Sequence, residues 1–178
     1  MDKETKPVYL DFNATTPFDP DVVQCISESL VTDWGNASST HDFGLTARKA
    51  LTLARQRVAR MLKCSDSEVV FMSGGTEVNY AVLHTFVTDG KYRQHEEKEP
   101  IVSPRPHIIT STIEHDSVRK PLEDLAKNQQ FDITFVPVNQ KTHCVNVLDV
   151  VGAIQDNTIL ISIMMANNET GLICVLFT

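Results

Sequence analysis

The chain has 178 residues, 42% of them hydrophobic and 22% charged, which is typical of a globular protein with a packed core. Its formal net charge of -7 argues against binding of nucleic acid or of an anionic membrane surface, because both attract clustered Lys and Arg. The sequence contains no run of about 18 apolar residues, and its start lacks the apolar core of a signal peptide. We therefore expect a cytosolic protein with no membrane segment. Its four cysteines form no CxxC pair and are expected to be reduced: Cys25, Cys64, Cys144 and Cys174.

Two helices are predicted in the first third of the chain. Asp19 is a favourable N-cap, and Pro20 suits the first position of a helix. The segment that follows carries apolar residues along one face: Val23, Ile26 and Leu30. After a small polar loop, a longer amphipathic helix is predicted, with basic residues between apolar ones. The apolar residues recur at helical spacing: Ala47, Leu51, Ala54, Val58 and Met61.

The rest of the chain alternates strands with helices. Apolar runs rich in β-branched residues predict strands at 68–73, 107–112, 133–138 and 158–167, the first of them buried on both faces. The polar segment 89–106, with several prolines, predicts a loop or surface insertion. This alternation implies βαβ units, and therefore an α/β fold with a mostly parallel sheet and helices on both faces.

Three helices are predicted between these strands. The first follows a pair of glycines and directs four apolar residues inward: Val78, Val82, Leu83 and Phe86. The second is capped by Ser117 and has Pro121 in its first turn, where proline is tolerated. Its inward residues are Leu122, Leu125 and Ala126. A short third helix is predicted at 147–155.

Small polar clusters follow three of the predicted strands: "SGGTE", "TSTIEHD" and "ANNETG". Ligands of parallel sheets bind at the carboxyl ends of strands, so we expect these clusters to share one site. In the first cluster, Gly74 and Gly75 permit positive φ and close approach of a ligand to the backbone. Thr76 and Glu77 then open a helix, whose free N–H groups attract an anion such as phosphate. The alternative is a glycine turn with a capping threonine.

The other two clusters contain a histidine and two asparagines. His115 could stack on the ring of a cofactor and shuttle protons, because imidazole exchanges protons near neutral pH. The alternative is a surface histidine paired with a neighbouring carboxylate, either Glu114 or Asp116. Asn167 and Asn168 could each donate to a ligand oxygen or cap the next turn, and capping is favoured for at least one of them.

Five motifs in this order resemble the class-V aminotransferase family of pyridoxal-phosphate enzymes, in its branch of cysteine desulfurases and selenocysteine lyases: "VYLDFNATTPFDP", "WGNASSTHDFG", "FMSGGTEVN", "ITSTIEHDSV" and "ISIMMANNETG". The resemblance covers residues 8–173, and 174–178 form a divergent apolar tail. It implies that residues 1–178 are an incomplete cofactor-binding domain, the N-terminal part of the large domain of fold type I. Within the branch, "EHDSVRKPLEDL" looks most like the animal selenocysteine lyases.

The resemblance assigns a cofactor, pyridoxal 5'-phosphate, and roles for four residues. Gly75 and Thr76 match positions that bind the cofactor phosphate, and Asn168 matches the asparagine that contacts the ring oxygen. His115 matches the histidine that stacks on the pyridine ring and takes part in proton transfer. The implied reaction splits L-selenocysteine into L-alanine and selenium in a homodimer. A cysteine desulfurase acting on L-cysteine remains the alternative, because no physical argument separates sulfur from selenium.

In relatives, three groups follow the "NNETG" motif: the lysine that binds the cofactor covalently, the aspartate that pairs with the pyridine nitrogen, and a mobile-loop cysteine. We therefore expect a truncated or alternatively spliced product, or an incomplete gene model, that shows no turnover by itself. An alternative of another class is a non-catalytic fragment that docks on a full-length subunit.

Overall fold

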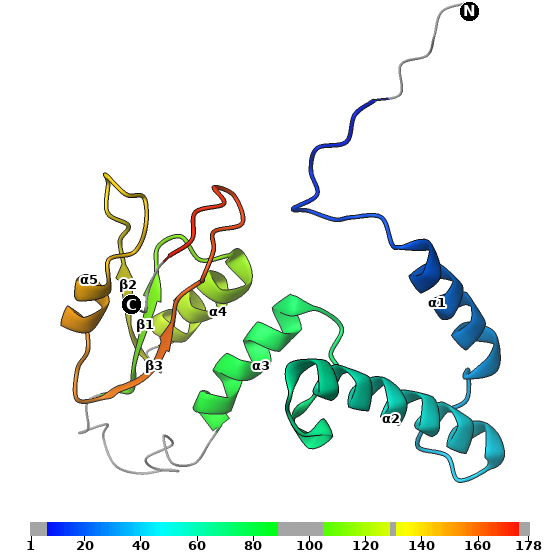
Figure 1. Ribbon diagram of the computed structural model, residues 1–178. Coiled ribbons are helices and arrows are strands. Elements are labelled where there is room, and N and C mark those ends of the chain that lie inside the picture. The colour runs from blue at the N-terminus through cyan, green and yellow to red at the C-terminus, as the bar shows by residue number, and fades with distance from the viewer. Residues whose placement is uncertain (1–6, 89–104, 129–130, 175–178) are drawn as a thin grey trace, which may run out of the picture. The chain divides into compact units, whose positions relative to one another are not determined.

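The computed structural model describes residues 7–88, 105–128 and 131–174 (Figure 1). The chain forms two compact units, Met1–Phe71 and Met72–Thr178, and each is described by itself. None of the helices in these described ranges is long and apolar enough to cross a membrane.

The first unit contains both helices predicted for it. Helix α1 spans Pro20–Thr32, and the Asp19 carboxylate caps it by accepting the Asp21 N–H at 2.9 Å. Helix α2 spans Asp42–Leu62 and is followed by a short 3₁₀ helix, η1, at Asp66–Glu68. Burial in these helices is confined to three small residues of α2: Gly44, Ala47 and Ala59.

The strand predicted at 68–73 is wrong. Glu68 ends η1, and the residues after it run as irregular backbone with no partner strand among the described residues. The side chain of Val70 is 68% exposed, although the prediction required burial on both faces. A strand needs a hydrogen-bonded neighbour, and this segment instead leads from one compact unit into the other at Phe71 and Met72.

The second unit is built on a three-stranded parallel sheet. Strands β1 (His107–Ser111), β2 (Asp132–Val136) and β3 (Thr158–Ser162) lie in the order β2-β1-β3, with β1 in the centre (Figure 1). Ile108 of β1 pairs with Ile133 of β2 and with Leu160 of β3. The predicted α/β fold with a parallel sheet is therefore confirmed.

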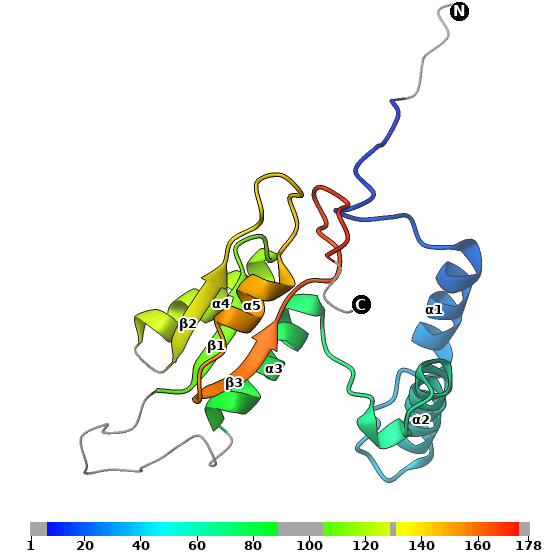
Figure 2. The ribbon, with the colours of Figure 1, turned by 60° about the vertical axis from the view of Figure 1, so that its left-hand side comes forward.

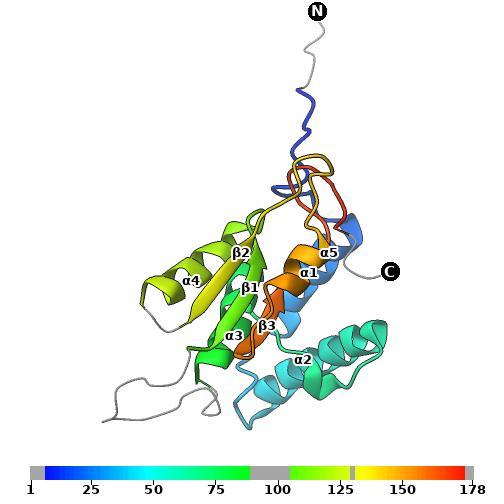
Figure 3. The ribbon, with the colours of Figure 1, turned by 90° about the vertical axis from the view of Figure 1, so that its left-hand side faces the viewer.

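Helices cover both faces of this sheet, as predicted. Helices α3 (Gly75–Thr88) and α4 (Asp116–Lys127) lie on one side and α5 (Val147–Gly152) lies on the other (Figures 2 and 3). Adjacent residues of a strand face opposite sides. Ile108 accordingly packs in one hydrophobic cluster with Leu83, Leu122 and Phe131. Its neighbour Ile109 packs in another cluster, with Val136, Val145, Val150 and Cys174.

Details of the predicted helices need correction. In α3, Leu83 is buried, but Val78 and Val82 are 41% and 52% exposed. The side chain of Phe86, and residues 89–104 of the predicted loop, lie outside the described residues. Helix α4 is capped by His115 instead of Ser117, and because it begins at Asp116, Pro121 lies beyond the first turn. Strand β3 also ends earlier than predicted, at Ser162.

Candidate cofactor-binding site

Two buried polar side chains join the segments that follow β1 and β3. The Glu114 carboxylate accepts the Ser111 hydroxyl at 2.6 Å and the Met164 N–H at 2.8 Å. The amide of Asn167 donates to the carbonyl oxygen of Ile113 at 3.1 Å. Glu114 and Asn167 are 8% and 7% exposed, so these bonds are shielded from water and hold the second and third polar clusters together.

Asn167 also caps the turn that follows β3. Its side-chain oxygen accepts the N–H groups of Glu169 and Thr170 at 3.0 and 2.9 Å, and Gly171 completes the turn with a φ of 70°. The predicted capping role for one of the two asparagines is therefore confirmed. Asn168 is exposed and donates its side-chain amide to the Glu169 carboxylate at 2.9 Å. Its contact with a ligand stays a prediction.

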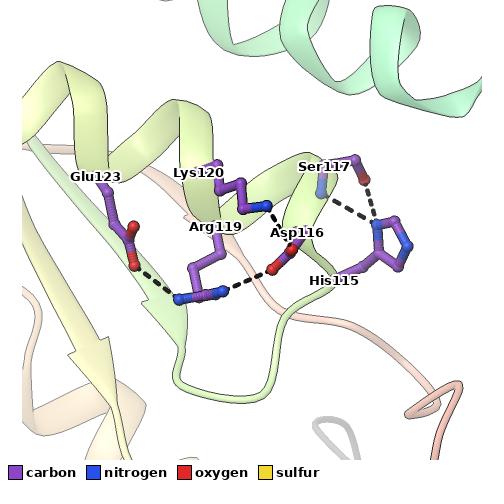
Figure 4. A network of polar contacts seen from close by, with 6 residues as sticks. All are labelled: His115, Asp116, Ser117, Arg119, Lys120 and Glu123. Carbon is purple, nitrogen blue, oxygen red and sulfur yellow. Dashed lines mark hydrogen bonds and ion pairs between the residues drawn. The ribbon is translucent and has the colours of Figure 1, made fainter.

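His115 is the N-cap of α4. Its Nδ1 atom accepts the backbone N–H of Ser117 at 3.1 Å and lies 2.8 Å from the Ser117 hydroxyl oxygen (Figure 4). The alternative of a pair with a neighbouring carboxylate is wrong, because Glu114 bonds to Ser111 and Asp116 forms ion pairs elsewhere. The imidazole ring of His115 is exposed.

Asp116 forms an ion-pair network along the exposed side of α4. Its carboxylate lies 2.8 Å from the Lys120 ammonium and 2.6 Å from the Arg119 guanidinium, which also bonds to Glu123 at 3.0 Å (Figure 4). Hydrogen bonds from Lys120 and Arg119 lower the pKa of Asp116 to about 2. Asp116 is therefore a fully ionised member of the network near neutral pH, where it has no proton to transfer.

The start of α3 is an open helix terminus. The first intrahelical bond runs from the Val78 N–H to the Gly74 oxygen at 3.1 Å, which leaves the N–H groups of Gly75, Thr76 and Glu77 without intrahelical partners. A Cβ atom added at Gly74 or Gly75 would meet nothing within 4 Å. Gly74 and Gly75 do not use the positive φ that glycine permits, because only Gly171 has one among the described glycines. The terminus is nevertheless free to contact an anion.

Glu77 folds back over the residue that precedes the glycines. Its carboxylate accepts the side-chain hydroxyl of Ser73 at 2.7 Å and the backbone N–H of the same residue at 2.6 Å. The hydrogen bond from the Ser73 hydroxyl, and after it the bond from the Ser73 N–H, lower the pKa of Glu77. The negative charge of Glu77 is thus engaged by Ser73, and the hydroxyl of Thr76 and the first amides of α3 fit a phosphate group.

A contact that the sequence did not predict ties α3 to His115. The side-chain amide of Asn79 donates to the Ser117 hydroxyl oxygen at 2.8 Å. Asn79 lies four residues after Gly75, so the two share one face of α3, about 6 Å apart along its axis. That spacing could have indicated that Asn79 lies on the same face as Gly75. Its partner, Ser117, depends on how α3 packs against α4 and could not be predicted from the sequence. The helices that follow the first and second polar clusters, α3 and α4, are therefore connected through Asn79 and Ser117.

Comparison with known proteins identifies the family. The profile of the family described as "Aminotransferase class-V" matches residues 8–176. The chain belongs to this family. A selenocysteine lyase from Rattus norvegicus is 41% identical over 174 residues, which cover 94% of this chain and 40% of that protein. Cysteine desulfurase IscS from Dictyoglomus turgidum is 38% identical over 172 residues, covering 94% of this chain and 39% of that protein.

A solved structure supports the same assignment. A NifS-like protein matches with a TM-score of 0.81 and 32% identity, over 94% of this chain and 42% of that chain. The predicted resemblance is thus confirmed, and the chain lies in the cysteine desulfurase and selenocysteine lyase group of class-V aminotransferases, which use pyridoxal phosphate. The chain spans about 40% of the length of the curated relatives that it matches.

Proposed function

We propose that this chain forms the cofactor-binding part of a pyridoxal-phosphate-dependent selenocysteine lyase, which converts L-selenocysteine into L-alanine and selenium. The observation that carries the proposal is the hydrogen-bonded chain from Asn79, one turn after the open start of α3, through Ser117 to the exposed His115. Similarity supports selenocysteine as the substrate. Five relatives named selenocysteine lyase are 38–46% identical to the chain, and three named cysteine desulfurase are 36–39% identical.

Each part of the site has a proposed task toward the cofactor. The N–H groups of Gly75 and Thr76, with the Thr76 hydroxyl, bind the phosphate at the positive end of the α3 dipole. His115 lies against the pyridine ring, and Asn168 donates its side-chain amide to the ring oxygen. The bound cofactor supplies an electron sink for the carbanion formed when the substrate loses its Cα proton.

A titration of the 178-residue chain with pyridoxal phosphate, followed by cofactor absorbance, tests the phosphate site. Thr76→Val removes a donor next to the phosphate and is expected to weaken binding roughly tenfold, which corresponds to about 1.4 kcal/mol. The control Thr85→Val changes the same residue type later in α3 and should bind like the wild type. Equal binding by all three proteins would contradict the phosphate site.

A chimera tests the reaction. In it, this chain replaces the matching segment of the rat selenocysteine lyase, and alanine release is measured with each substrate. The proposal requires a higher kcat/KM for L-selenocysteine than for L-cysteine. The reverse preference would instead support a cysteine desulfurase, which the similarity to cysteine desulfurase IscS keeps as the second candidate. We also propose that the chimera is a homodimer, which sedimentation equilibrium can test.

A further inference from the structure

A three-residue chain of hydrogen bonds links α3 to the N-cap of α4. The Asn79 amide nitrogen lies 2.8 Å from the Ser117 hydroxyl oxygen, which lies 2.8 Å from Nδ1 of His115. The backbone N–H of Ser117 also points at Nδ1, at 3.1 Å. In Figure 4 the second ring nitrogen of His115, Nε2, lies on the side of the ring away from Ser117.

The direction of these bonds is fixed by which groups can only donate. A backbone N–H has no lone pair to offer, so Nδ1 must accept from Ser117 and must be unprotonated. The Asn79 amide nitrogen likewise only donates, so the Ser117 oxygen accepts from it and keeps its own proton for Nδ1. Neutral imidazole carries a single N–H. The proton of neutral His115 therefore resides on Nε2.

Ser117 and Asn79 are less exposed than His115, the residue to which they are linked. Ser117 is 8% exposed and Asn79 is half-buried, whereas the ring of His115 is exposed. Within the described residues, Nε2 of His115 forms no hydrogen bond. The buried side of the site thus holds Nδ1, and the remaining N–H is available to a ligand.

We propose that Ser117 and Asn79 are positioning residues that keep neutral His115 in its Nε2–H form, so that the imidazole offers a hydrogen-bond donor to an acceptor atom of the bound ligand. The identity of that ligand rests on the proposed function, but the tautomer is a property of this chain alone. In this form His115 cannot take up a proton at Nδ1 without losing the cap of α4. Its neutral state presents the Nε2–H group as a donor toward the ligand.

Nitrogen NMR of the ¹⁵N-histidine-labelled 178-residue chain tests this directly, at a pH above the titration range of histidine. His115→Gln identifies the resonances of His115. In the wild type, Nδ1 should have a pyridine-like shift and Nε2 a pyrrole-like shift. Ser117→Ala removes one of the two donors to Nδ1 and should lower the ratio of Nε2–H to Nδ1–H roughly two- to tenfold, the effect of one hydrogen bond.

Two further variants exclude a merely structural effect. Asn79→Asp replaces the amide donor by a carboxylate that draws the Ser117 proton away from Nδ1, so the ratio should fall in the same direction. The control Thr112→Ala removes a hydroxyl from the loop between β1 and α4 and should leave the ratio unchanged. The ring signals of His107, which bonds to Thr134 and Thr158 across the sheet, report that the second unit remains folded in every variant.

A pyrrole-like Nδ1 in the wild type would overturn the proposal. So would a ratio in Ser117→Ala and Asn79→Asp that equals that of Thr112→Ala. The cofactor titration separates this result from the proposed function. If the tautomer is as expected but the chain does not bind the cofactor, the positioning role is supported and the proposed function is rejected. If the chain binds the cofactor but Ser117→Ala and Asn79→Asp leave the tautomer ratio unchanged, the proposed function is supported and the positioning role is rejected.

Discussion

The two compact units of the chain use their apolar residues differently. In the second unit, Ile108, Ile109 and Leu122 are fully buried between the sheet and its helices. In the first unit, large apolar side chains such as Leu30 and Met61 are each 73% exposed, and the helices are defined by caps and local hydrogen bonds. All four residues predicted to contact the cofactor lie in the second unit. The unit that carries the candidate site is therefore also the unit with large apolar side chains buried in a core.

The largest expected effect contrasts one leucine from each unit. Leu122→Ala empties a fully buried position beside Ile108 and should lower the free energy of unfolding by about 3 kcal/mol. Leu51→Ala in α2 truncates a side chain that is 42% exposed and should lower it by less than about 1 kcal/mol. The effect of Leu122→Ala is measured by urea unfolding monitored through amide hydrogen exchange of β1. The effect of Leu51→Ala is measured by urea unfolding monitored through the fluorescence of Trp34, the single tryptophan.

Equal losses in the two variants would break the comparison between the units. A larger loss for Leu51→Ala would reverse it, because the first unit would then depend more on apolar contacts than the second. The volume-conserving Leu122→Met is the matched control at the buried site and should lower the free energy of unfolding by less than about 1.5 kcal/mol.

The sequence predicted features that depend on neighbouring residues better than features that depend on how distant segments pack. Helix α1 was predicted from Asp19 and Pro20 because capping depends on neighbours in sequence. The strand predicted at 68–73 was wrong because an apolar run does not show whether a partner strand will lie beside it. The same limit applies to the site. The turn at Asn167 is local and was foreseen, whereas the bond between Asn79 and Ser117 depends on how two helices pack.

The next effect contrasts adjacent asparagines inside the second unit. Asn167→Ala leaves the N–H groups of Glu169 and Thr170 without their acceptor and should lower the free energy of unfolding by about 2 kcal/mol. Asn168→Ala changes an exposed residue and should alter it by less than about 0.5 kcal/mol while weakening cofactor binding. Urea unfolding and cofactor titration of both variants measure these effects. Unchanged binding in Asn168→Ala would remove that residue from the proposed site.

A smaller effect comes from the buried histidine of β1. Burial lowers the pKa of His107 from 6.5, with a weaker opposing effect of Asp132. The unfolded chain therefore binds more protons below pH 6.5, so the stability contributed by neutral His107 is complete above this pH and is lost as pH falls. His107→Gln cannot titrate, so its free energy of unfolding should vary less between about pH 4 and 6.5.

The control for this pH dependence is an exposed histidine of the same unit. His143 lies in a turn with a φ of 55°, a conformation that asparagine tolerates. His143→Asn should therefore keep the wild-type slope of unfolding free energy against pH. A flattened slope in this variant as well would show that burial of His107 is not the cause.

The last comparison concerns Gly75, an open position at the start of α3 in the second unit. A methyl group there would meet nothing within 4 Å, and the backbone of Gly75 has no positive φ, so Gly75→Ala should change the free energy of unfolding by less than about 1 kcal/mol. Cofactor binding should nevertheless weaken, because the added methyl group occupies space through which a phosphate approaches the first amides of α3. Urea unfolding and cofactor titration distinguish the two effects, with Gly152→Ala, another open glycine, as control. Weakened binding at constant stability would show that Gly75 serves a ligand and not the fold, whereas unchanged binding would leave a glycine turn at the start of an ordinary helix.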